Sequence, residues 1–141
     1  MSNETLLLLC AIGALLGIML FFAFAVAPTV FRSLPAEHAG AYLREIFPRY
    51  YLWGIILAII TAGIAFQVDT TVFTTVSVTA ALFIFSRQIL LPAINIARDA
   101  KLSGEDGAVP RFKRLHLISV LINLSQMLML VGCIVYLVYN S

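Results

Sequence analysis

Charge is scarce in this 141-residue chain: charged residues make up 11% of it, and hydrophobic residues make up 62%. A soluble globular domain carries about 25% charged residues, so this composition excludes an ordinary soluble domain. Residues 5–31 and 115–141 contain no Lys, Arg, Asp or Glu at all. The net charge of +2 is also too small to favour nucleic-acid binding, so we expect no nucleic-acid partner.

Residues that bind metals or perform catalysis are equally sparse. The chain has two cysteines, Cys10 and Cys133, and two histidines, His38 and His116. No stretch gathers three or four metal ligands at a recognisable spacing, so we predict no metal site and leave the cofactor unassigned. Both cysteines fall in apolar runs, where a cysteine usually serves as a small apolar residue. A disulfide or metal pair between them is the alternative.

What the chain does contain is long apolar runs. A helix needs about 20 such residues to cross the hydrocarbon core of a membrane. The sequence predicts an all-α membrane protein, a single four-helix bundle with spans at about residues 5–30, 49–68, 71–92 and 115–139. We expect the first span to be a retained helix, because it lacks the basic start of a signal peptide. Only a very short turn around Asp69 separates the second and third spans, so these two helices must be antiparallel neighbours.

The basic residues indicate the orientation. All nine Lys and Arg residues lie in or beside two connections, residues 32–49 and 98–114, on one side of the bundle. Basic residues near short loops favour the cytoplasmic side. We therefore predict a bacterial inner-membrane protein with both termini outside (N-out/C-out). In the first connection, a short amphipathic helix from about Ala36 to Phe47 is expected to lie along the interface, and Pro48 to begin the second span.

Small residues at four-residue spacing form two strips, Gly13 with Gly17 and Gly54 with Ala58. Such strips allow helix backbones to approach closely. They favour tight packing within the bundle, and they also permit a homo-oligomer within the lipid bilayer.

Polar residues inside a span are costly, so they indicate where a site could lie. His116, Ser119, Asn123 and Gln126 fall within an arc of about 80° on the fourth helix. They either form hydrogen bonds between helices or build a ligand or proton site. A second set, Arg87, Asn95, Arg98 and Asp99, lies on the third helix and its extension. It forms either an interfacial anchor with an ion pair or a site for an acidic group such as a lipid phosphate.

Several runs resemble the transmembrane protein 205-like family of small four-helix membrane proteins. They are residues 24–31 with Leu34, Ala39-Gly40, residues 47–51, Arg87, Pro92, Asn95, Arg98-Asp99, Phe112, Leu115-His116, Ser119 and Asn123. The resemblance covers nearly the whole chain. It implies a fold and a shared cytoplasmic-side group of residues, without a defined reaction. Eukaryotic members are associated with resistance to platinum drugs.

Two functional hypotheses follow. The first is a non-enzymatic membrane protein that supports transport, stress tolerance or metal-drug tolerance. Its polar ligand or partner site at the cytoplasmic end would comprise Pro28, Arg87, Asn95, Arg98, Asp99, His116, Ser119 and Asn123. The second is a haem- or porphyrin-linked redox enzyme that uses His38 or His116.

Overall fold

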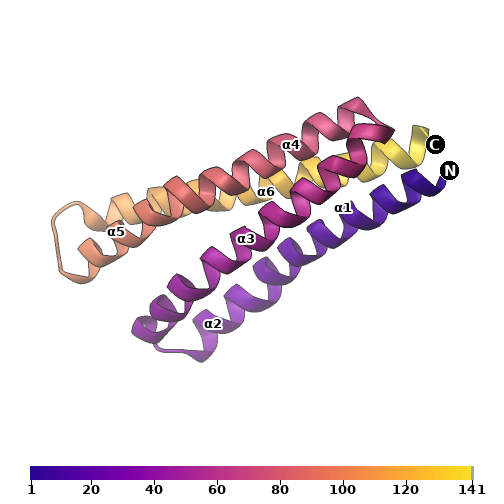
Figure 1. Cartoon of the computed structure of the whole chain (residues 1–141). Coiled ribbons are helices and arrows are strands. Elements are labelled where there is room, and N and C mark those ends of the chain that lie inside the picture. The colour runs from indigo at the N-terminus through magenta and orange to yellow at the C-terminus, as the bar shows by residue number, and fades with distance from the viewer. Residues whose placement is uncertain (141) are drawn as a thin grey trace.

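The computed structural model describes residues 1–140 as four helical rods that fold back on one another (Figure 1). The first rod comprises α1 (Asn3–Phe21), the π-helical turn η1 (Phe22–Val26) and α2 (Ala27–Ser33), and the second is α3 (Ala36–Val68). The third comprises α4 (Thr70–Phe85), the π-helical turn η2 (Ser86–Leu90) and α5 (Leu91–Leu102), and the fourth is α6 (Ala108–Asn140). Each rod is long and apolar enough to cross a membrane, which confirms the expected four-helix membrane bundle.

The rods form two hairpins, α1–α3 and α4–α6, with two distinct ends (Figure 1). Both chain termini and the α3–α4 turn lie at one end, which we call the terminal end. The connections 34–35 and 103–107 lie at the other, the loop end. The α3–α4 turn is the single residue Asp69, whose carboxylate accepts a hydrogen bond from the backbone N–H of Val72 and caps α4. The expected short turn between antiparallel neighbours is confirmed.

Close packing of α3 on α4 holds the two hairpins together. Gly54 and Ala58 are buried on α3, and an added Cβ atom at Gly54 would lie 2.6 Å from the Phe83 ring of α4. This strip of small residues is therefore used within the chain. Gly13 and Gly17 are exposed instead, with no neighbouring atom within 4 Å of an added Cβ.

A π-helical turn precedes a proline in the first rod of each hairpin. Proline lacks an N–H, and its ring clashes with the carbonyl group four residues earlier. Just before Pro28, the Ala27 N–H bonds to the Phe22 carbonyl, five residues back. Just before Pro92, the Leu91 N–H bonds to the Ser86 carbonyl in the same way. The two hairpins therefore repeat one design, with a widened turn at the point where each first rod passes towards the loop end.

The rods are longer than a membrane is thick. Each contains 31 to 33 residues, or about 50 Å at 1.5 Å per residue, whereas the hydrocarbon core measures about 30 Å. The expected spans lie inside these rods. We expect the excess to fall at the loop end, because most Lys and Arg residues lie in the segments next to that end and charge is excluded from the hydrocarbon core.

The first connection differs from the expected separate interfacial helix. Residues 36–47 are helical, but they form the beginning of α3, which continues through Pro48 without a break. Leu43 and Ala39 are buried and pack in a small apolar cluster with Val30 of α2. These contacts hold the segment along the bundle, whereas its amphipathic pattern alone predicted a helix that lies along the membrane interface.

Candidate functional site

The two hairpins diverge towards the loop end (Figure 1), and a cavity of about 680 Å³ lies between them. Its walls come from α2, α3, α5 and α6. Apolar side chains form much of the lining, including Phe31, Leu43, Phe47, Leu91 and Ile94. A cavity of this size is typical of small-molecule sites, which usually measure about 300–1,000 Å³.

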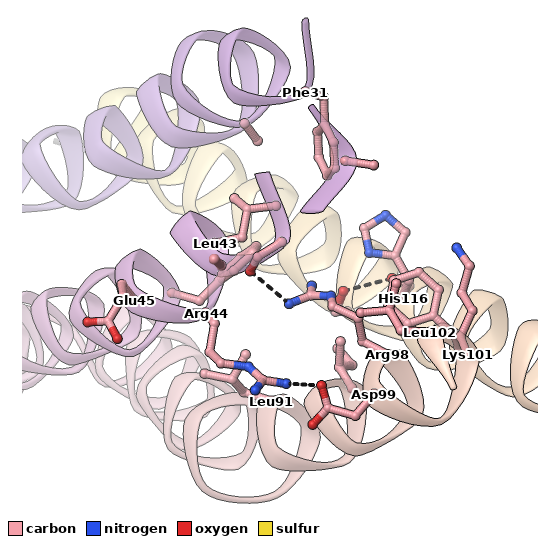
Figure 2. A pocket seen from close by; sticks show the side chains of 18 of the residues that line it. Phe31, Leu43, Arg44, Glu45, Leu91, Arg98, Asp99, Lys101, Leu102 and His116 are labelled. Carbon is pink, nitrogen blue, oxygen red and sulfur yellow. Dashed lines mark hydrogen bonds and ion pairs between the residues drawn. The ribbon is translucent and has the colours of Figure 1, made fainter. Parts of the chain in front are cut away.

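Two arginines bridge the hairpins along one side of this cavity (Figure 2). Arg44 of α3 donates to the Asp99 carboxylate of α5 at 2.6 Å, and also to the Asn95 carbonyl oxygen at 3.3 Å. Arg98 of α5 donates in the opposite direction, to the Gly40 carbonyl oxygen of α3 at 3.3 Å. Since both partners of the ion pair are exposed, the pair contributes little to stability, at most about 1 kcal/mol. The pair links α3 to α5 across the two hairpins.

Aromatic and basic side chains adjoin Arg98 in the cavity wall. Phe112 and His116 lie one helical turn apart on α6 with their rings almost parallel, at an interplanar angle of 4° and 6.1 Å between centroids. The Lys101 ammonium lies 4.9 Å from the Phe112 centroid, and the Arg98 guanidinium carbon lies 5.7 Å from it. Both distances are within the range of a cation–π interaction. Two cations thus share one aromatic ring at the edge of the cavity.

The polar stripe of α6 divides between two roles. His116 and Ser119 line the cavity, and the Ser119 hydroxyl donates to the His116 carbonyl oxygen of its own helix at 2.7 Å. Further towards the terminal end, Asn123 accepts a hydrogen bond from Tyr50 of α3 at 2.9 Å. Buried Gln126 donates to the Thr79 carbonyl oxygen of α4 at 3.0 Å. Hydrogen bonding between helices therefore accounts for the deeper half of the stripe.

Below the cavity, an aromatic cluster closes the bundle. It contains Phe22, Phe47, Tyr50, Tyr51 and Phe83, with ring centroids of neighbouring members 4.2 to 6.5 Å apart. The members come from η1, α3 and α4. Because they join both hairpins, they fix the depth at which the hairpins begin to separate.

The structure brings together half of the sequence-predicted site. Arg98, Asp99, His116 and Ser119 line the cavity. Of the others, Asn95 adjoins it through its bonds to Arg44 and Arg98. Three residues lie outside the lining: Pro28, Arg87 and Asn123. Pro28 follows η1. Arg87 of η2 donates to the Pro48 carbonyl oxygen at 3.3 Å, and Asn123 bonds to Tyr50.

The cavity residues that the sequence did not indicate as site members include Arg44, Lys101 and Phe112. Arg44 and its partner Asp99 are 55 positions apart, so the only signal in the sequence was that both lie in basic connections. Phe112 is one of the residues that resemble the transmembrane protein 205-like family, but nothing in the sequence predicted that two cations lie against its ring.

The two histidines lie in different surroundings. His116 lines the cavity, whereas His38 is exposed near the start of α3 and lies outside the lining. Across residues 1–140, no three His, Cys, Asp or Glu side chains are grouped so that they could hold a metal ion. Cys10 is exposed and Cys133 is buried, and both are free thiols.

These features define a multi-pass, four-helix membrane protein whose hairpins enclose a cavity at the loop end. The sequence profile described as "Domain of unknown function (DUF4149)" matches residues 10–103, and the chain belongs to this family. An uncharacterized protein of Aquifex aeolicus (strain VF5) is 27% identical over 134 residues, which cover 95% of this chain and 96% of that protein. None of the solved structures gives a significant match.

Proposed function

We propose that this protein is a non-enzymatic ligand-binding protein of the bacterial inner membrane, with its binding site in the loop-end cavity. The observation that carries the proposal is the cavity itself, whose apolar walls and few convergent polar groups resemble those of small-molecule sites. Pro28, Arg87 and Asn123 belong to this proposal as supports, because they lie on the elements that shape or border the cavity.

Transport of the ligand is the role that the repeated hairpin design favours. Many transporters contain two structural repeats and place the substrate site at the interface between them. Here the cavity lies between two hairpins that each carry a π-helical turn before a proline. The resemblance to the transmembrane protein 205-like family belongs to the same proposal, and it adds tolerance to metal-containing drugs as a physiological role.

Mass spectrometry of gently extracted protein tests the binding site. We expect a bound small molecule on the native protein and its loss in Ala41→Trp, because Ala41 lines the cavity and an indole there would occupy part of the space that the ligand needs. Tyr42→Trp is the matched control, since the neighbouring Tyr42 is 43% exposed and lies outside the lining. A native protein without a bound molecule, or a molecule retained in Ala41→Trp, would refute the proposal.

Orientation is a separate part of the proposal, with the loop end in the cytoplasm. In a background with Cys10→Ala and Cys133→Ala, a membrane-impermeant thiol reagent added outside the cell should label Thr70→Cys and Asn140→Cys. Both positions are exposed at the terminal end. Ser103→Cys, at the loop end, should react only after the membrane is permeabilised. The reverse pattern would place the cavity outside the cell.

A further inference from the structure

The charges around the cavity are only partly paired. Arg44 is paired with Asp99 at 2.6 Å, and Glu45 with Arg49 at 3.6 Å. Arg98 and Lys101 form no ion pair with any residue in the described part of the chain. The lining also includes the carboxylate of Glu37, which is exposed near the start of α3. Two cations that line the cavity therefore have no carboxylate within ion-pair distance among residues 1–140.

Arg98 retains unused hydrogen-bond donors. Its Nη1 group donates to two neutral acceptors, the Gly40 carbonyl oxygen at 3.3 Å and Asn95 Oδ1 at 3.5 Å. A guanidinium has five N–H donors, so the hydrogens on Nε and Nη2 have no acceptor among residues 1–140. The Arg98 side chain is half-buried beside the cavity (Figure 2), so water solvates its free N–H groups less than it would at an open surface.

Lys101 completes a site for an anion. Its ammonium and the Arg98 guanidinium both lie against Phe112, so two positive charges line the same part of the cavity. An anion bound there would accept the free donors of Arg98 and would be attracted by the Lys101 ammonium. Phosphate and carboxylate groups fit the planar guanidinium fork.

The rest of the lining selects for an apolar body on the same ligand. Phe31, Leu43 and Leu91 line the cavity (Figure 2), and so do Phe47 and Ile94. Relative to the spans expected from the sequence, Leu91 lies at the end of the third span, and the other four residues lie within six positions of a span end, where we expect the lipid headgroups. A basic pocket between membrane helices at that depth is the arrangement that binds acidic lipid headgroups.

We propose that the cavity binds an anionic amphiphile, with its phosphate headgroup on Arg98 and Lys101 and its apolar part against Phe31, Leu43 and Leu91. Acidic phospholipids of the surrounding bilayer are the source to which the proposal commits. It rests on the proposed function, since it specifies which ligand the loop-end cavity takes.

The test compares lipids retained by the protein after extraction from vesicles of equal parts phosphatidylglycerol and phosphatidylcholine, measured by native mass spectrometry. We expect phosphatidylglycerol to predominate. Lys101→Ala should reduce its retention roughly fivefold, the effect of one basic residue near an acidic lipid. Lys113→Ala is the matched control with the same change of charge, because Lys113 is exposed on α6 outside the cavity lining. Arg98→Lys, which keeps the charge but loses the fork, should give an intermediate loss.

Each alternative outcome has a defined meaning. Equal retention of the two lipids, or equal losses in Lys101→Ala and Lys113→Ala, would overturn the anionic site. Displacement of the lipid by millimolar inorganic phosphate would overturn the amphiphile, since the apolar wall would then contribute nothing. If Ala41→Trp still abolishes binding in those cases, the cavity remains the binding site and only the ligand class fails. If Ala41→Trp has no effect, the proposed function fails as well.

Discussion

Phe22→Ala should lower the free energy of unfolding by about 3 kcal/mol, the lower end of the range for removing a buried phenyl ring. Phe22 is 8% exposed, and it stacks on Tyr50 with centroids 4.2 Å apart and an interplanar angle of 19°. It also contacts Phe47 at 5.1 Å. Inside a bilayer, helix association depends on such packing, because lipid is as apolar as the protein interior. The loss of stability is therefore expected to come from the cavity that the missing phenyl ring leaves in the aromatic cluster. It can be measured by detergent titration monitored by circular dichroism.

Phe21→Ala provides the control at the preceding position. Phe21 is 67% exposed on the outer surface of the bundle, so its ring contacts lipid in place of protein. We expect a change below about 0.5 kcal/mol, as for other exposed positions. Equal losses for Phe21→Ala and Phe22→Ala would show that the aromatic cluster does not join the hairpins.

Gly54→Ala is expected to destabilise the protein by about 1–3 kcal/mol, the usual cost of overpacking. The new methyl group would lie 2.6 Å from the Phe83 ring, which is fully buried and held by Tyr50 and Tyr51. The ring cannot move aside without disturbing the cluster. Alanine is otherwise the better helix former by about 1 kcal/mol, so a net loss would identify the contact as the cause.

The same substitution at Gly63 should raise the free energy of unfolding. Gly63 lies on the same helix, and nothing is within 4 Å of an added Cβ. Gly63→Ala should therefore stabilise the protein by up to about 1 kcal/mol. Combining Gly54→Ala with Phe83→Leu should cost less than the sum of the two single changes, because the smaller side chain vacates the space. Additive losses in thermal unfolding would contradict a direct contact between these positions.

Local patterns were sufficient to predict the bundle, because each span is a run of apolar residues and each hairpin connection is short. The continuity of α3 through Pro48 could not be predicted in this way. A proline in a helix costs about 3 kcal/mol or more, and the contacts that retain the helix come from distant segments. They include Val30 against Leu43 and the Arg98 bond to Gly40, which is 58 positions away.

The site was predictable in location but not in composition. Arg98, Asp99, His116 and Ser119 were expected at the cytoplasmic end, and the structure places them around one cavity. The periodicity of the polar residues on α6 could not show which of them bond to other helices and which line the cavity. A helical wheel shows which residues share a face of the helix, but not which residues they contact. Only the fold places Tyr50 opposite Asn123 and leaves His116 facing the cavity.

Because α3 continues through Pro48, it is one continuous helix that extends along the whole molecule. It runs from Asp69 at one end of the molecule to the wall of the cavity at the other. The 29 residues from Gly40 to Val68 extend about 43 Å, so a tilt of about 5° at Asp69 would displace Gly40 by about 4 Å. That displacement exceeds the 3.3 Å bond between Arg98 and the Gly40 carbonyl oxygen. The Asp69 turn and the Gly40 carbonyl at the cavity wall thus lie at the two ends of one continuous helix.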